Sequence, residues 1–374
     1  MTGWRVLAVV AGTAIVAYDA WDLVRALVVP RPATSGLVAA CTRTLRRGLH
    51  RLAVRRHSFE ARDRALATIE PSLILVRLLL WMVIGYAGFA LVLYGVGHRT
   101  LAHAFVDSGS SITTLGFATE PGSVSAVITF LAAGFGLVVV ALQIAFLPAL
   151  YDAFNRREVL VTMLESRAGT PAWGPELVAR HHLVGIQENL AALYADWERW
   201  AADVAESHTS YPILMYLRSP RATNSWVTGL LAVLDSAALA LAVNPTTTPV
   251  EARLCLRMGF TCLRDIARVI RIPFDPDPLP DAPIELTYEE FAAAIDRLAR
   301  AGVPMDRGPA EAWPDFRGWR VNYESIAYAV ADLVYAPNAP WSGRRTGVDE
   351  AVLAPARPTH RAPDKPEGDP AAAT

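Results

Sequence analysis

The stretch SSITTLGFAT, residues 110–119, lies between two long apolar runs and carries small hydroxyl side chains, one glycine and no charge. The preceding run, residues 72–97, contains a single charged side chain, that of Arg77. The following run, residues 123–154, has no charge before Asp152. Each run is long enough to cross about 30 Å of hydrocarbon as a helix. The pattern therefore predicts a polar loop held between two membrane-spanning helices.

A third apolar segment, residues 4–30, lies near the amino terminus, so that residues 1–30 are expected to contain the first membrane helix. Its apolar part is followed by Asp19, Asp22 and Arg25. The competing interpretation is a signal peptide, but no small-x-small cleavage site follows the apolar core. We therefore expect a retained helix. Asp22 and Arg25 are one helical turn apart, which predicts that they pair.

Arginine sets the expected orientation, because cytoplasmic loops carry an excess of positive charge. The segment between the first two spans holds a cluster of arginines: Arg43, Arg46, Arg47, Arg51, Arg55, Arg56, Arg62 and Arg64. Arg156 and Arg157 follow the third span. Residues 31–70 and everything after 155 are therefore expected inside, and residues 98–122 outside. This predicts a multi-pass protein of the cell (plasma) membrane with a cytoplasmic carboxyl-terminal domain.

The basic segment 31–70 has the pattern of an amphipathic helix. Arg43, Arg47 and Arg51 share one helical face, and Leu45, Leu49 and Leu52 lie on another. Such a helix suits the membrane interface, where its arginines meet anionic headgroups. A lipid bilayer with anionic headgroups is therefore the first expected partner.

The external segment predicts a short helix followed by a loop. Residues 100–111 can form about three helical turns, and Thr100 is a suitable cap. Pro121 and Gly122 then turn the chain into the next span. Irregular backbone at membrane depth is tolerated where it is buried in protein or lines water. Uncharged carbonyl and hydroxyl oxygens can there replace the hydration shell of a cation.

The letters TTLGFAT resemble the Thr-x-Gly-Tyr/Phe-Gly-Asp selectivity filter of the potassium-channel pore domain. The resemblance covers residues 72 to about 152, in the order span, short helix, filter and inner span. It implies a homotetramer, because each chain supplies one pore loop. It also implies a transported monovalent cation, which in the family's pattern is K+. The filter so implied comprises Thr113, Thr114, Leu115, Gly116, Phe117 and Ala118. The carbonyl groups of its members from 114 to 117, with the Thr114 hydroxyl, would face the ions.

Two positions depart from the family's pattern, because Ala118 replaces its second glycine and Thr119 its aspartate. The family holds that second glycine in a backbone shape that other residues disfavour. A left-handed conformation at an alanine costs about 1–2 kcal/mol. The sequence therefore predicts a rearranged outer filter, with potassium selectivity and conduction left open.

The inner span carries three candidate functional residues. By the same resemblance, Gly134 and Gly136 lie where the family's inner helix bends. Gly136, Val140 and Gln143 follow a spacing of three or four and share a face. Gln143 is the polar member of this face, and it either lines an inner vestibule or contacts another helix.

Residues 156–337 are expected to form a cytoplasmic helical domain without strands. Residues 225–243 are apolar enough to span, but Asp235 at their middle favours a buried helix inside this domain. Thr287 and Glu290 have the spacing of a capping box. Residues 338–374 are rich in Pro, Ala, Arg and Asp, which predicts a disordered tail. The fold class expected is an all-α membrane protein with three transmembrane helices and one re-entrant pore loop.

Signs of enzyme chemistry are sparse. Cys41, Cys255 and Cys262 form no Cys-x-x-Cys pair, so we expect buried reduced thiols and no zinc site. His208 with nearby acids is a weak metal candidate, and Arg218 with Arg221 forms either a packed turn or an anion site. No metal, cofactor or catalytic residue is predicted. The formal net charge of −1 favours no nucleic-acid partner.

Three functions compete on these observations. The first is a tetrameric, potassium-conducting cation channel that is gated or assembled by the cytoplasmic domain. The alternative is a non-conducting pseudo-channel that serves as a membrane scaffold or sensor, which Ala118 favours. The third is a membrane-anchored enzyme, which the lack of a catalytic motif disfavours.

Overall fold

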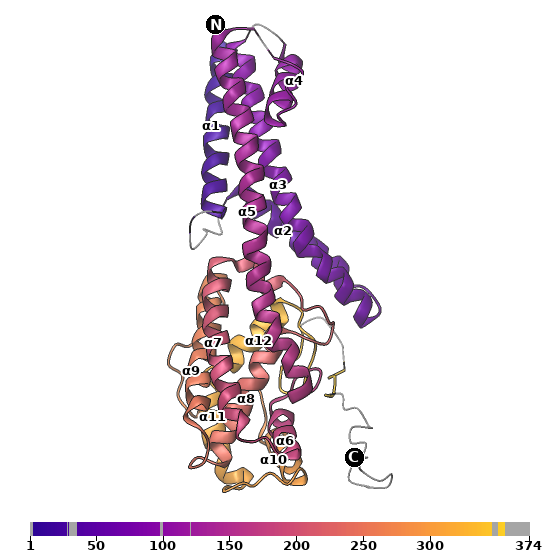
Figure 1. The fold of residues 1–374 in the computed structure, drawn as a ribbon, viewed down its shortest axis with the longest axis vertical. Helices are drawn as coiled ribbons and strands as arrows, with labels where there is room; N and C mark the ends of the chain where they lie inside the picture. Colours follow the sequence, from indigo (N-terminus) through magenta and orange to yellow (C-terminus); the bar gives the residue numbers. More distant parts are fainter. Residues whose placement is uncertain are drawn as a thin grey trace. The chain divides into compact units, whose positions relative to one another are not determined.

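A computed structural model describes residues 3–27, 29, 36–97, 100–119, 121–345 and 351–355, and these contain helices and no strand (Figure 1). The chain divides into two compact units, Met1–Phe154 and Asn155–Thr374, close to the expected domain boundary after residue 155. The helices of the first unit are α1 (Gly3–Leu27), α2 (Leu37–Val54), α3 (Phe59–Val96), α4 (Leu101–Ile112) and α5 (Ser123–Ala168), the last of which continues into the second unit.

Among the described residues, four helices are long and apolar enough to cross a membrane: α1, α3, α5 and, in the second unit, α8 (Trp226–Val243). In the first unit α1 and α4 both pack on α3 (Figure 1). Glycine lets α1 approach α3 closely, because a Cβ atom on Gly12 would lie 2.6 Å from the carbonyl oxygen of Gly88. Small residues that allow close backbone approach are typical of helix contacts in membranes.

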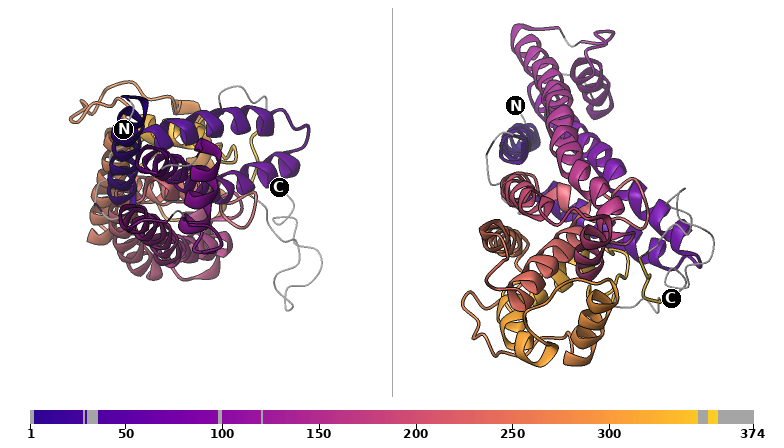
Figure 2. Two further views of the ribbon diagram at one scale, coloured as in Figure 1. Left: turned by 90° about the horizontal axis from the view of Figure 1, so that it is seen from above. Right: turned by 60° about the horizontal axis from the view of Figure 1, so that its bottom comes forward.

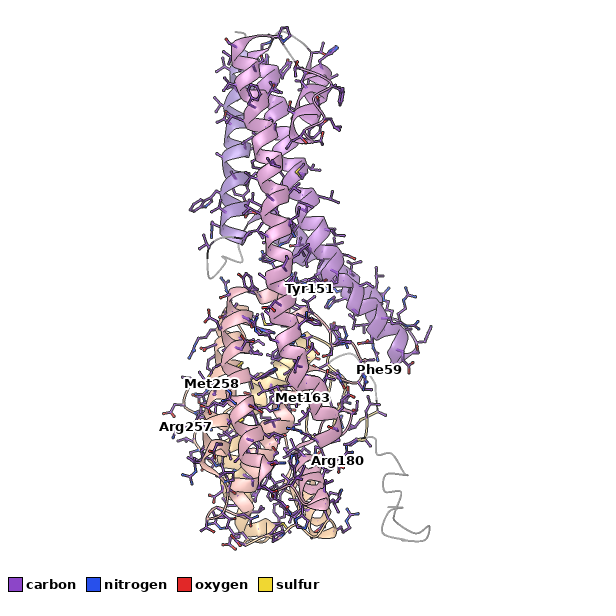
Figure 3. The ribbon with its side chains drawn as sticks, viewed as in Figure 1. Phe59, Tyr151, Met163, Arg180, Arg257 and Met258 are labelled. Carbon is purple, nitrogen blue, oxygen red and sulfur yellow. The ribbon has the colours of Figure 1, made fainter. Side chains whose placement is uncertain are left out.

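The basic segment forms α2, which packs against the first part of α3. Arg46 donates to both carboxylate oxygens of Glu70 at 2.7 and 2.9 Å. The end of the basic segment and the span that follows it belong to one helix, because α3 begins at Phe59 (Figure 3) and continues through Pro71. Ser58 caps this helix by accepting a hydrogen bond from the amide of Ala61.

The second unit is a bundle around α8 (Figure 2). Every residue of α8 except Ala240 is buried, so this apolar helix forms the centre of the unit's core. Its surrounding elements are α6 (Gly174–Val184), α7 (Asn189–Ser210), η1 (Pro212–Tyr216), α9 (Val250–Ile270), α10 (Tyr288–Arg300), α11 (Pro309–Arg320) and α12 (Glu324–Leu333). The capping box predicted at Thr287 and Glu290 is present at the start of α10.

A buried ionic network joins these helices. Arg320 is fully buried and pairs with Asp235 of α8 and Glu324 of α12. Asp235 also accepts a hydrogen bond from Tyr323 at 2.9 Å. Because the charges are paired and hydrogen-bonded, Asp235 is satisfied inside the core rather than exposed to lipid.

The tail predicted from residue 338 is wrong for residues 338–345. Trp341 and Arg345 are buried, and the Trp341 carbonyl accepts a hydrogen bond from Arg320 at 2.7 Å. Arg345 in turn donates to the carbonyl of Ala336 at 2.7 Å. An arginine and a tryptophan therefore anchor a segment whose composition alone suggests disorder. Residues 346–350 and 356–374 of the predicted tail lie outside the described residues.

Candidate pore-loop site

The short helix α4 is fixed on α3 by polar and aromatic contacts. Thr100 caps its first turn through the amide of His103. Ser108 donates to the carbonyl of Tyr86 on α3 at 2.8 Å, and the rings of Tyr86 and Phe105 lie 5.2 Å apart. These contacts place the carboxyl end of α4 inside the first unit, with Ile112 in the core.

The loop that follows α4 is hydrogen-bonded back onto one residue, Ser110. The Ser110 carbonyl accepts from the amides of Leu115 at 2.9 Å and Gly116 at 3.1 Å. Its hydroxyl accepts from the amide of Ala118 at 2.9 Å. Ser110 is itself buried. The loop is therefore held to the end of α4 by the N–H groups of Leu115, Gly116 and Ala118.

Positive φ values occur at two alternate positions of this loop. Thr114 has φ 58° and Gly116 has φ 70°, whereas Leu115 and Phe117 have no positive φ. The amides of Leu115, Gly116 and Ala118 converge on Ser110. Within the described part of the chain, the carbonyl oxygens of residues 114–117 accept no hydrogen bond.

The backbone at Ala118 differs from the left-handed conformation that the family's pattern implied for this position. Ala118 has no positive φ, so the predicted backbone cost of alanine in a left-handed conformation does not arise there. Thr114 and Gly116 take the left-handed positions instead. The Thr114 hydroxyl donates to the carbonyl of Thr113 at 2.7 Å, and the Thr113 hydroxyl donates to Gly109 at 2.6 Å.

The three candidates on α5 lie in different environments. Gly136 is buried against the end of α4, where a Cβ atom would collide with the carbonyl of Ile112. Gly134 is exposed, and nothing lies within 4 Å of the position that its Cβ would take. Gln143 is buried, and its Oε1 atom has no hydrogen-bond partner among the described residues, so its two expected environments both stay predictions. The helix is continuous through all three positions.

Sequence reasoning missed Ser110 as the anchor of the loop. The residue stands in the quoted stretch, but four hydroxyl residues surround it in sequence and no spacing rule distinguishes it from them. The one available signal is its place in the last turn of a helix, where carbonyl groups lack intrahelical partners.

The predicted pair of Asp22 and Arg25 is not formed. Asp22 accepts a hydrogen bond from the indole of Trp81 on α3 at 3.1 Å. The Arg25 guanidinium lies over the ring of Trp21. An aromatic donor on the neighbouring helix therefore replaces the arginine as the partner of this carboxylate.

The metal candidate in the second unit is not assembled. Asp203 pairs with Arg156 at 3.2 Å, whereas His208 is buried beside Arg157 at 3.1 Å. Burial and the neighbouring Arg157 cation hold the pKa of His208 well below its usual value. Among the residues whose placement is known, no group of three or more His, Cys, Asp or Glu side chains could hold a metal ion.

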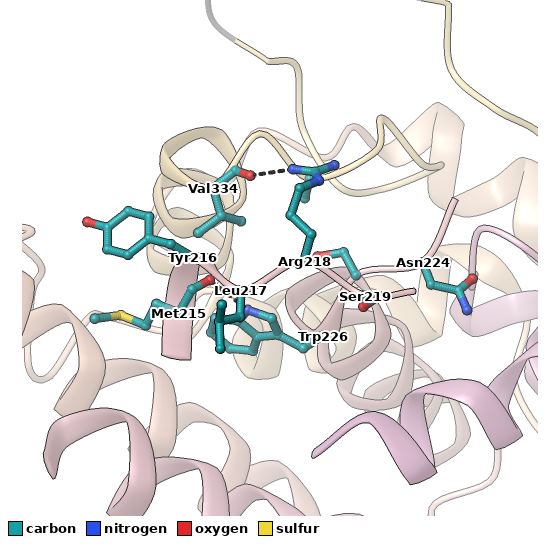
Figure 4. A pocket seen from close by; sticks show the side chains of 10 residues that line it. Met215, Tyr216, Leu217, Arg218, Ser219, Asn224, Trp226 and Val334 are labelled. Atoms are coloured by element: carbon teal, nitrogen blue, oxygen red, sulfur yellow. Dashed lines mark hydrogen bonds between the residues drawn. The ribbon is translucent and has the colours of Figure 1, made fainter. Parts of the chain in front are cut away.

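The two arginines considered for an anion site already have protein partners. Arg218 donates to the carbonyls of Val334 at 2.9 Å and Tyr335 at 3.0 Å, beside a pocket that Trp226 helps to line (Figure 4). Arg221 pairs with Glu165. The alternative, a packed turn, describes these contacts better.

No family model, curated protein or solved structure matches this chain.

Proposed function

We propose that four copies of this chain form a cation channel in which K+ passes the backbone carbonyls of residues 114–117. The observation that carries the proposal is the polarity of the loop. The amides of Leu115, Gly116 and Ala118 are bound to Ser110, and the carbonyls of residues 114–117 have no donor among the described residues. Carbonyl oxygens in such an arrangement can coordinate a dehydrated cation.

The single chain leaves this loop incomplete as an ion site. Leu115 and Phe117 each expose 70% of their surface, which is unusual for large apolar side chains in an ordered loop. Each chain contributes one loop, so several copies must meet for carbonyls to surround an ion. A homotetramer around one axis buries these side chains between neighbouring subunits.

The membrane arrangement follows from the apolar helices and the arginines. In this proposal α1, α3 and α5 cross the cell membrane, and α8 stays in the core of the second unit. The arginines of α2 then lie at the cytoplasmic interface, where they bind anionic headgroups. The helical unit after residue 155 lies in the cytoplasm and gates or assembles the pore.

A non-conducting pseudo-channel is the second candidate, and the Thr113–Thr114 pair favours it. The Thr114 hydroxyl is bonded to the carbonyl of Thr113. That bond withdraws a hydroxyl and a carbonyl from any ion at the inner end of the loop. In this case the tetramer serves as a scaffold or sensor.

The assembly itself is tested by the mass of the purified protein in lipid nanodiscs, measured by native mass spectrometry. The proposal predicts a tetramer. A monomer or dimer at all protein concentrations would overturn it, because neither can surround an ion with carbonyl groups.

A further inference from the structure

Asp19 of α1 is a buried acid without a side-chain partner among the described residues. Its side chain is shielded from solvent, and only the backbone of Gly85 on α3 lies near its carboxylate as a hydrogen-bonding group. Asp22, one turn further along the helix, accepts a hydrogen bond from the indole of Trp81. Of these two acids, Asp22 has a side-chain donor and Asp19 has none.

Three helices meet at Asp19. A Cβ atom added to Gly85 of α3 would lie 3.3 Å from Asp19 Oδ2 and 2.5 Å from Cε1 of Phe135 on α5. The absence of a side chain at position 85 thus leaves room for both the acid and the ring. If α5 moved so that Phe135 left this position, the carboxyl group of Asp19 would be less closely packed.

The groups that face Asp19 offer it no positive charge. Its own helix contributes Asp22, an acid of the same sign. The neighbouring part of α3 contributes the backbone of Gly85. It also contributes the indole of Trp81, which is bonded to Asp22, and α5 contributes the apolar Phe135. An ionised carboxylate without a counter-ion is costly to bury, and the neutral acid is far less so.

We propose that Asp19 is a proton-binding site that holds a proton while α1, α3 and α5 are packed at Gly85 and releases it when α5 moves away. Proton binding and helix packing are then linked, since each favours the other. If the chain conducts, which rests on the proposed function, this site makes conduction depend on pH through the position of α5.

Infrared difference spectroscopy tests the proton site without any transport. The full-length protein in nanodiscs is titrated with acid and base, and the carbonyl band of protonated carboxyl groups is followed. We expect one component of this band to be lost in Asp19→Asn and kept in the matched control Asp22→Asn. A wild-type band that is unchanged by Asp19→Asn would overturn the proposal.

The same variant has a stability readout. Asparagine has the shape of the neutral acid and cannot ionise, so we expect Asp19→Asn to fold. In the wild type, the unfolding temperature should fall as pH rises, because a buried Asp19 would then have to ionise. In Asp19→Asn this fall should be absent. Failure of this variant to fold would also contradict a neutral Asp19. Absence of ion flux in all variants would contradict the proposed channel function but not the proton site at Asp19. The infrared and unfolding results do not depend on conduction.

Discussion

The carbonyl oxygen of Ile112, at the end of α4, occupies the space in which a side chain on Gly136 of α5 would stand. The two helices meet here without a side chain between them. The resemblance to pore domains suggested a bend at this glycine, but its contact shows a steric role in seating α4.

Gly136→Ala should therefore displace the end of α4 and the loop attached to it. The methyl group meets backbone rather than a flexible side chain, so we expect a loss of about 1–3 kcal/mol in unfolding free energy. Thermal unfolding and ion flux of the purified protein measure the effect. Gly134→Ala is the matched control, because its Cβ enters open space. Equal behaviour of the two variants would contradict the steric role.

Ser110→Ala should loosen the loop while leaving α4 in place. The change removes the hydroxyl that accepts from the amide of Ala118, and an unsatisfied buried group costs about 1–3 kcal/mol. We expect faster hydrogen exchange at residues 115–118. The control is Ser111→Ala, whose hydroxyl bonds only within its own helix, to Asp107. Exchange rates that match those of the control would show that Ser110 does not anchor the loop.

The α2 helix should insert an apolar strip into the membrane interface. Leu45 and Leu52 are 40% and 60% exposed, and Cys41 is exposed near them. Because Cys255 and Cys262 are buried, a thiol-reactive fluorophore should label Cys41 selectively. We expect quenching of this label by lipids that carry a quencher in the upper acyl chain.

The arginines of α2 should make this insertion sensitive to lipid charge. Arg47 and Arg51 are exposed beside the strip, and each basic residue near an anionic surface contributes about 1 kcal/mol. Replacing both by glutamine should weaken quenching in anionic vesicles and have little effect in neutral ones. Full quenching by the double variant in anionic vesicles would argue against headgroup binding.

His208 should make the second unit less stable in acid. Its folded-state pKa lies well below the usual 6.5, because burial and Arg157 disfavour the imidazolium. The unfolded chain therefore takes up a proton first as pH falls. The stabilisation is complete above about pH 6.5 and is lost below it, by at most about 1.4 kcal/mol per pH unit.

Chemical unfolding of the wild type and His208→Gln between about pH 8 and about pH 5 tests this dependence. The variant should be less stable at neutral pH and should show a flatter decline in acid. An unchanged slope would assign the acid sensitivity to other groups.

The positions of local signals could be predicted from the sequence. Thr100 and Thr287 begin α4 and α10 as expected, because a cap acts on amides within one turn of itself. The burial of the apolar helix around Asp235 was also predicted, since a charge at the centre of a lipid-exposed helix is costly.

Partners that are distant in sequence could not be predicted. Asp22 bonds to Trp81, which is 59 positions away, and Trp341 reaches Arg320 from a segment with the composition of a disordered tail. The role of Ser110 as the anchor of the loop depends on the loop amides that converge on it, and their positions are not specified by the sequence pattern. Such contacts depend on how helices are rotated against one another, and no periodicity specifies that rotation.

Potassium and sodium flux into liposomes is the most direct test of the channel. We predict flux that favours potassium in the wild type, persists in Gly134→Ala and disappears in Gly116→Ala. Gly116 has φ 70°, and a side chain there costs about 1–2 kcal/mol in each subunit. Equal flux of both ions would show that the chain forms a pore that does not select potassium over sodium. Confirmed tetramers that carry neither ion, across the pH range in which they stay folded, would contradict the channel and leave the pseudo-channel.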